Sequence, residues 1–345
     1  MSKVEEIMKE INKEQKATII TQGLAQYDFE RIPFTSPRLN YMTFGGIPVG
    51  KLIEFYGENH GGKTTTALDL VANYQRMPNS KGVLYVDQEN SLDTVWARKL
   101  GVDLERSDFY VLSPSGQGAE TVFDMIIKMI ETGEIGLAII DSLGAMMSNK
   151  AFEEDIEDKQ YGGISMGLTK FSKKAEMLCN RTGCTVIGIN QWRADLNSQF
   201  GGYTTPGGEA WKFMCSVRME FRMGKYFDEK GNDLTRQAEN PYGNYVLVNM
   251  KKNKTCPPTR RTGFYTLTYL DGIDYLADLV EVAIKFGIID KSGAWFSILD
   301  METGEQIVKL QGQQKVNEYL EDEEHRDVLE KIEKFIDSKI QEDDR

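Results

Sequence analysis

Short apolar runs alternate with stretches of helical periodicity through the middle of the chain. Each apolar run has the length of a buried strand, and the stretches between them repeat at the spacing of amphipathic helices. Strands that alternate with helices predict βαβ units and a mostly parallel sheet, and therefore an α/β fold. The predicted strands are Leu52–Tyr56, Val83–Val86, Leu137–Asp141 and Thr185–Asn190, and helices are predicted after Lys63, Ser91, Gln117 and Met166.

The pattern changes on both sides of this α/β region. A helix is predicted over residues 3–15, followed by the β-prone run Ala17–Ile20. A helix of this length is not stable alone, so it must pack on its own core or on a neighbouring subunit. Three further strand-like runs separated by loops are Ser216–Arg222, Asn244–Met250 and Gly263–Tyr269. We therefore expect a segment 1–32, a core 33–270 and a small α-rich end 271–345.

The composition fits one large core with a small appendage. The chain has 345 residues, of which 40% are hydrophobic. It has no apolar run of the roughly 18 residues that a membrane span needs. The charged N-terminus does not look like a secretory signal, so the default expectation is a cytoplasmic protein. The four cysteines, which form no C-x-x-C pair, are expected to be reduced and packed; they are Cys179, Cys184, Cys215 and Cys256.

The net charge of −12 argues against a basic nucleic-acid binder. The charge is uneven, however, because residues 321–345 hold 11 acidic and 5 basic residues and therefore carry −6, half of the total. Such an acidic tail often marks an exposed interaction segment. Without it the body is mildly acidic and can still contain a local basic channel.

A phosphate-binding loop follows the first predicted core strand. The sequence from Gly57 reads G-x-x-x-x-G-K-T and leads into a helical run. Glycines let backbone N–H groups turn toward phosphate oxygens, and a helix N-terminus adds its positive end. In this loop Lys63 would reach the β- and γ-phosphates of ATP, and the Thr64 hydroxyl would hold Mg²⁺. The predicted loop residues are Gly57, Glu58, Asn59, His60, Gly61, Gly62, Lys63, Thr64 and Thr65.

Polar groups at the ends of the next strands complete this prediction. Asp141 ends an apolar strand, as expected of a carboxylate that supports the Mg²⁺ shell. Asp87 and Glu89 follow another strand, and on chemistry alone either carboxylate could polarise the attacking water. Gln191 directly follows the predicted strand Thr185–Asn190, where its amide could sense the γ-phosphate and pass that signal to the following loop.

Several segments in one order resemble the bacterial RecA recombinase family over almost the whole chain. They are Tyr85–Asp93, Trp96–Asp103, Ile189–Arg193, Gly207–Phe213, Lys252–Lys254 and Gly293–Trp295. The resemblance implies a RecA-like P-loop core in a DNA-dependent ATPase. It also implies filaments on single-stranded DNA and strand exchange with a homologous duplex.

The resemblance assigns roles to individual residues. Glu89, rather than Asp87, would activate water, and Gln191 would be the γ-phosphate sensor. Asp93, Trp96 and Tyr269 would contact the adenine. Lys252 and Lys254 would reach the ATP site of the adjacent subunit, although a solvated basic turn is the alternative from the sequence alone. The segment 1–32 would pack on the neighbouring protomer, and an open head-to-tail contact of this kind gives a helical homo-oligomer.

Two loops would face DNA in such a filament, at about 152–163 and 192–208. The second loop suits a single strand, because it offers a cation for phosphate, apolar groups that can lie against bases, and hydroxyl and backbone donors. An ordinary flexible loop has the same composition. The implied DNA contacts are Arg193, Leu196, Phe200, Thr204, Thr205, Gly207 and Gly208.

The C-terminal region would help to capture duplex DNA, and its acidic tail would restrain that capture electrostatically. Single-strand-binding and loader proteins would be further partners. The P-loop interior, Glu58–Gly61, departs from the usual family sequence, and Asp195 stands where a lysine is common. These departures suggest a divergent, phage-type member, and a role in repressor self-cleavage is not inferred. A ring helicase and an ATP-binding regulator of a recombinase are the alternatives.

Overall fold

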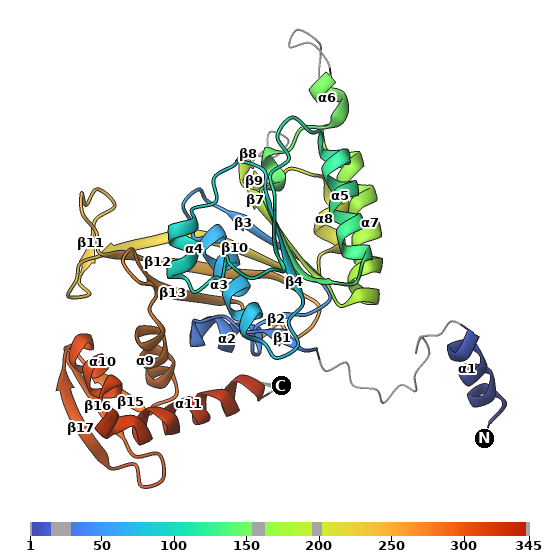
Figure 1. The fold of residues 1–345 in the computed structure, drawn as a ribbon. Coiled ribbons are helices and arrows are strands. Elements are labelled where there is room, and N and C mark those ends of the chain that lie inside the picture. Colours follow the sequence, from blue (N-terminus) through green and yellow to red (C-terminus); the bar gives the residue numbers. More distant parts are fainter. Residues whose placement is uncertain (1, 15–28, 154–162, 195–201, 343–345) are drawn as a thin grey trace. The chain divides into compact units, whose positions relative to one another are not determined.

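The computed structural model describes residues 2–14, 29–153, 163–194 and 202–342, which form two compact units. The first unit, Met1–Glu30, contains helix α1 (Lys3–Glu14), close to the predicted bounds. The predicted strand Ala17–Ile20 lies outside the described residues. The second unit, Arg31–Arg345, holds the rest of the chain (Figure 1). Among the described residues, no helix has the length and apolar character needed to cross a bilayer.

A ten-stranded sheet, counted over the described residues, forms the centre of the second unit. Six of its strands are parallel to one another, and β12 to β14 continue the sheet antiparallel at one side. In spatial order the strands are β14 (Gly272–Ile273), β13 (Thr262–Thr268), β12 (Gly243–Asn253), β10 (Val217–Phe227), β3 (Leu52–Gly57), β7 (Thr185–Gln191), β6 (Ile135–Asp141), β4 (Gly82–Asp87) and β5 (Phe109–Leu112), with β11 (Asp233–Leu234) beside β10. The predicted α/β class with a mostly parallel sheet is confirmed.

Helices cover both faces of this sheet, so successive residues of each central strand are buried in different cores (Figure 1). One core packs against α2 (Pro37–Thr43), α3 (Lys63–Arg76) and α4 (Thr94–Lys99). The other packs against α5 (Ala119–Glu131), α7 (Ser165–Thr182) and α8 (Glu209–Met214). Smaller elements are β1 (Arg31–Ile32) paired with β2 (Ile47–Pro48), α6 (Asn149–Glu153), and β8 (Arg193–Ala194) paired with β9 (Tyr203–Thr204).

The C-terminal part is rich in helix, as predicted, and also contains a three-stranded antiparallel sheet that the sequence analysis did not identify. Its elements are α9 (Tyr275–Lys285), β15 (Ile289–Ser292), β16 (Trp295–Leu299), β17 (Gln306–Gln311), α10 (Gln313–Glu321) and α11 (Arg326–Gln341). Together they enclose a separate apolar cluster.

The acidic segment 321–345 differs from the exposed tail expected from its charge. Helix α11 occupies most of it and buries Ile332, Ile336 and Ile340, which recur every four residues and share one face. Arg260 fixes the end of this helix. Its guanidinium lies over the rings of Tyr41 and Phe44, and it donates to the carbonyl oxygens of residues 339, 340 and 342 at 3.1, 3.1 and 2.7 Å.

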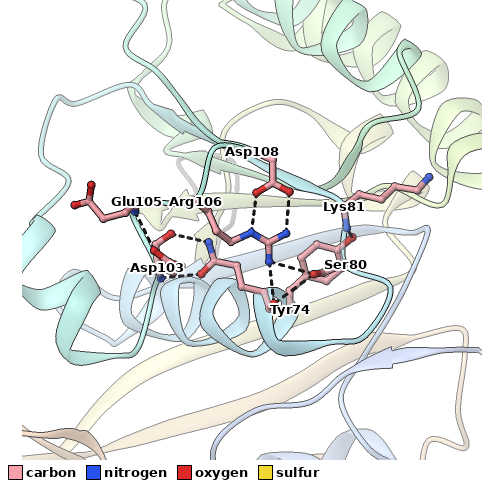
Figure 2. Close-up of polar contacts among 8 residues, drawn as sticks. Tyr74, Ser80, Lys81, Asp103, Glu105, Arg106 and Asp108 are labelled. Atoms are coloured by element: carbon pink, nitrogen blue, oxygen red, sulfur yellow. Dashed lines mark hydrogen bonds and ion pairs between the residues drawn. The ribbon is translucent and has the colours of Figure 1, made fainter.

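Arg106 ties the end of the P-loop helix α3 to the segment that leads into edge strand β5 (Figure 2). It binds both carboxylate oxygens of Asp108 at 2.7 and 2.8 Å, and its remaining terminal nitrogen donates to the Gln75 carbonyl at 2.9 Å and to Ser80 Oγ at 3.2 Å. Gln75 in turn bonds both backbone groups of Asp103 at 2.9 Å. This network satisfies a carbonyl at the helix C-terminus and orients β5.

We expect Arg106→Ala to lower the free energy of unfolding by about 1–2 kcal/mol, because it removes charge-assisted hydrogen bonds from a three-quarters-buried side chain. The hydrogen bond from Arg106 holds the pKa of Asp108 below its ordinary value. This contribution is therefore present at neutral pH and disappears as the pH falls through that lowered pKa. Urea denaturation followed by circular dichroism would measure both effects. Arg98→Ala, which removes an exposed ion pair with Glu105, should change little; equal losses in the two variants would contradict the prediction.

Candidate functional site

The P-loop turns tightly between β3 and α3 and requires glycine at both ends. Gly57 has φ 143°, and a Cβ there would lie 2.0 Å from the Phe221 carbonyl oxygen. Gly62 has φ 87°, and a Cβ there would lie 2.8 Å from the Tyr265 hydroxyl. Both positions are closed to larger residues, so the loop stays against β10. It then continues directly into the first turn of α3. This is the geometry of an anion cradle.

Lys63, the first residue of α3, is 7% exposed and directs its ammonium into the loop. Its Nζ donates to the carbonyl oxygens of Glu58 at 2.7 Å and Gly57 at 3.4 Å. Burial lowers the pKa of Lys63, and the nearby carboxylates, Asp141 first among them, oppose this. A buried ammonium held by neutral carbonyl groups is well suited to receive a polyanion.

Thr64 and Asp141 meet at the ends of α3 and β6. Thr64 Oγ1 donates to Asp141 Oδ2 at 2.7 Å, and the Tyr85 hydroxyl donates to the same oxygen at 3.0 Å. Burial raises the pKa of Asp141, and the two hydrogen bonds act against this. A hydroxyl and a carboxylate oxygen so close together form a hard oxygen donor set, and this set fits Mg²⁺.

The two candidate bases beyond β4 have different surroundings. Asp87 is 5% exposed, and its two oxygens accept from the backbone N–H groups of Ser91 and Leu92 at 3.0 and 2.9 Å. Glu89 is exposed and accepts from Ser142 Oγ at 2.9 Å. Ser142 follows Asp141 directly, so Glu89 lies beside the Thr64–Asp141 pair. Asp87 holds its own loop, whereas the Glu89 carboxylate has an oxygen available for chemistry.

A cleft of about 580 Å³ adjoins the P-loop. In its lining, Trp96 Nε1 donates to Thr65 Oγ1 at 3.3 Å, and the Tyr269 hydroxyl donates to Asn244 Oδ1 at 2.9 Å. Asp93 lies outside the lining and caps α4, accepting from the N–H groups of residues 95 and 96 at 2.9 Å. The lining residues are His60, Gly61, Gly62, Lys63, Thr64, Thr65, Trp96, Met223, Tyr226, Asn244, Leu267 and Tyr269.

Gln191 pairs in register with Gly57 across strands β7 and β3, so it lies beside the first residue of the P-loop. The next residue, Trp192, donates its N–H to the Gly57 carbonyl at 3.4 Å and stacks on Tyr203 with ring centroids 4.9 Å apart. Gln191, the last residue of β7, therefore lies between the phosphate loop and the loop that begins at Trp192.

The predicted DNA contacts in that loop have unequal exposure. Arg193 is exposed and donates to the Gly144 carbonyl at 3.2 Å. Thr204 accepts from Lys212 Nζ at 3.0 Å, whereas Thr205 is 4% exposed. Gly207 and Gly208 have φ 103° and 79° and lead into α8. Leu196, Phe200 and most of the predicted first loop, residues 154–162, lie outside the described residues.

Lys252 and Lys254 lie together away from the cleft. Lys252 Nζ donates to the carbonyl oxygens of Lys212 and Phe213 at 2.8 and 2.7 Å, and Lys254 Nζ donates to the latter at 3.2 Å. Burial, and then the charge of Lys254, lower the pKa of Lys252. Lys252 is eight residues along β12 from Asn244, a separation of about 26 Å in a strand. The pair does not reach the cleft of its own protomer.

Sequence reasoning missed the wall of the cleft that β10 and β12 supply, including Tyr226 and Asn244, because no local motif marks it. It also missed Tyr85 and Ser142, which orient Asp141 and Glu89. The position of Ser142 directly after the strand end at Asp141 was an available local signal, whereas Tyr85 lies inside β4 and has no such signal.

Comparisons with known proteins agree across the chain. The family described as RecA N-terminal domain matches residues 2–274, and the RecA C-terminal domain matches residues 277–341. Protein RecA of Clostridium perfringens strain 13 is 34% identical over 81% of this chain and 73% of its own length. Protein RecA of Ruminococcus albus is 32% identical over 93% and 76%, and that of Fusobacterium nucleatum 33% over 88% and 77%.

Proposed function

The chain belongs to the RecA family of DNA-dependent ATPases and recombinases, and we propose how its own residues divide the work of that activity. The family uses ATP with Mg²⁺. The observation that carries our assignment is the meeting of Lys63, Thr64, Asp141 and Glu89 beyond the carboxyl ends of β3, β6 and β4. Ligands of α/β sheets bind at this edge.

Within one protomer, the P-loop and the start of α3 would hold the triphosphate, with Lys63 at the β- and γ-phosphates. Thr64 and Asp141 would hold Mg²⁺, which supplies charge neutralisation for the phosphates when bound. Glu89 would orient and deprotonate the attacking water. Trp96 and Tyr269, which both line the cleft, would contact the base, and the Asp93 carboxylate would face its edge.

Lys252 and Lys254 would serve the ATP site of a neighbouring protomer. Their distance from their own cleft and their shared position on Phe213, which is 72% exposed, support a role across a subunit contact. Cations supplied in trans stabilise charge on transferring phosphoryl groups. The site would therefore be complete only in the assembled filament.

The N-terminal unit and edge strand β5 would form another part of that filament contact. Tyr110 and Val111 on β5 are 41% and 48% exposed, and β5 is an edge of the central sheet. An exposed edge with apolar side chains accepts an added strand. We assign this role to the β-prone run 17–20 of the adjacent protomer.

Single-stranded DNA would bind along the loop 192–208, with Arg193 at a phosphate and Gly207 and Gly208 offering backbone N–H groups. Leu196 and Phe200 would lie against bases. Thr204 and Thr205 would also contact the DNA, after a rearrangement of the loop. Gln191 would report the γ-phosphate to this loop. Base pairing with a homologous duplex, captured with help from the C-terminal region, would supply sequence specificity.

ATP hydrolysis measured with and without long single-stranded DNA tests the proposal. We expect stimulation of about tenfold or more, together with electron micrographs of open helical filaments and exchange of strands with a homologous duplex. Rings of fixed subunit number would indicate a helicase instead. DNA-stimulated hydrolysis without strand exchange would indicate a regulator of another recombinase. If DNA did not stimulate hydrolysis, the proposed roles in DNA binding and strand exchange would be contradicted, and only the assignment of the P-loop as an ATP site would stand.

A further inference from the structure

A row of polar side chains crosses the central sheet on the face that α5, α7 and α8 cover. Arg218 on β10 is the register partner of Glu54 on β3 and of Lys252 on β12, so the three residues stand side by side across adjacent strands. Glu54 is fully buried and the Arg218 side chain is 16% exposed. Neighbouring positions on this face belong to an apolar core, so a buried charge row here needs a specific arrangement of partners.

Glu54 satisfies both of its carboxylate oxygens within this row. Oε2 accepts from Arg218 Nε at 2.5 Å, and Oε1 accepts from Asn190 Nδ2 at 3.1 Å. The guanidinium of Arg218 also lies 4.7 Å from the centroid of the Tyr56 ring. Because Arg218 has two bonded or stacked neighbours on β3, its position is fixed by that strand.

Asn190 connects this row of side chains to the loop that we propose contacts DNA. It is fully buried, and its Nδ2 also donates to the Pro206 carbonyl at 3.0 Å. Its Oδ1 accepts from the N–H of Gln191 at 3.2 Å. A movement of the loop at residue 206 therefore acts on the same amide that holds Glu54 and that precedes the γ-phosphate sensor.

At the other end of the row, Arg218 and Lys252 are like charges on directly opposite positions, which is destabilising unless an anion lies nearby. Glu54 provides that anion, and its charge also acts on Lys252. The Lys252 ammonium is thus directed away from Arg218, onto the carbonyl oxygens that end α8. Those carbonyls form the negative end of the helix that follows the DNA loop.

We propose that Glu54 is a positioning residue that couples the DNA-facing loop to Lys252, through Asn190 on one side and Arg218 on the other. This inference rests on the proposed function, because it takes the loop as the DNA contact and Lys252 as a residue that acts on the neighbouring ATP site. DNA that moves residue 206 changes the hold of Asn190 on Glu54. A change in the Glu54–Arg218 pair then alters the attraction and repulsion that act on the Lys252 ammonium, and so changes the direction in which Lys252 points.

The test is Glu54→Gln, which keeps the shape and one acceptor oxygen but removes the charge. We expect the stimulation of ATP hydrolysis by single-stranded DNA to fall about tenfold, while the KM for ATP and the unstimulated rate change less than about twofold. Glu54→Asp, which keeps the charge, should recover part of the stimulation. The double variant Glu54→Gln/Arg218→Gln leaves no unpaired buried charge, so it guards against loss of folding and should lose stimulation equally.

Glu220→Gln is the matched control. Glu220 is also buried, on the same strand as Arg218, and pairs with Arg222 and Lys251 outside the row. It should show a similar loss of thermal stability with stimulation retained. Stimulation within twofold of wild type in both Glu54→Gln and the double variant, or equal loss of stimulation in Glu220→Gln, would overturn the inference. Two other results would instead overturn the proposed function on which this inference rests. They are hydrolysis by the wild-type protein that DNA does not stimulate, and full DNA-stimulated hydrolysis by Lys252→Ala.

Discussion

Glu89→Gln is expected to lower the DNA-stimulated kcat for ATP hydrolysis by about 10²–10⁴-fold, the usual contribution of a general base. Glutamine can keep the hydrogen bond from Ser142 Oγ, so the loop should stay in place while the proton acceptor is lost. ATP binding and filament formation on DNA should persist, since neither requires proton transfer. Steady-state hydrolysis, nucleotide binding by fluorescence and electron microscopy would measure the three properties separately.

Asp87→Asn is the informative comparison for this prediction. Both Asp87 oxygens accept backbone N–H groups, and an amide offers only one acceptor oxygen. We expect lower stability of the loop that carries Glu89, with partial activity that improves at lower temperature. If Asp87→Asn abolished hydrolysis in a well-folded protein while Glu89→Gln left it unchanged, the roles of the two carboxylates would have to be exchanged.

Lys252→Ala is expected to reduce DNA-stimulated hydrolysis by about 10³-fold or more, as for other cations supplied in trans to a phosphoryl group. Lys63→Ala should be inactive for a different reason, because it loses the phosphate contact in its own P-loop. In an equal mixture of the two inactive proteins, a protomer with an intact P-loop can meet a neighbour with an intact Lys252. In random head-to-tail assembly, half of the protomers have an intact P-loop, and half of their neighbours have an intact Lys252. About a quarter of the sites are then complete, so we expect about a quarter of wild-type activity.

Lys251→Ala controls for the loss of a positive charge at this place. Lys251 is exposed, lies next to Lys252 on β12, and pairs with Glu220. It should keep near-normal hydrolysis on its own, whereas Lys252→Ala on its own should not. A mixture of Lys252→Ala and Lys63→Ala that stays inactive, although both proteins form filaments together, would show that each site is self-contained.

The sequence predicted the central strands well because their apolar runs are uninterrupted and end at chemically distinctive residues. The predicted strand Leu52–Tyr56 is observed as Leu52–Gly57, and the strand predicted to end at Asp141 does end there. Parallel strands buried on both faces give this strong signal. The P-loop and the acid that follows it are thus readable from local spacing alone.

Features that depend on distant parts of the chain were not readable. The cleft wall of Tyr226 and Asn244 comes from a long antiparallel pair, β10 and β12, whose register has two irregularities. The net charge of the C-terminus predicts an exposed tail, whereas isoleucines at four-residue spacing place one face of α11 in a core. Net charge describes solubility and partners, whereas periodicity describes burial, and here periodicity decided the structure.

The attachment of α11 through Arg260 sets a practical limit on how the C-terminus can be engineered. A deletion that removes only residues 343–345 leaves all the carbonyl acceptors of this guanidinium in place. A deletion from residue 339 onward strips three of them and leaves a buried cation between two aromatic rings. Shortened proteins made to study the acidic residues should therefore end at 342, and an affinity tag or fluorophore fused at this end needs a flexible spacer after that residue.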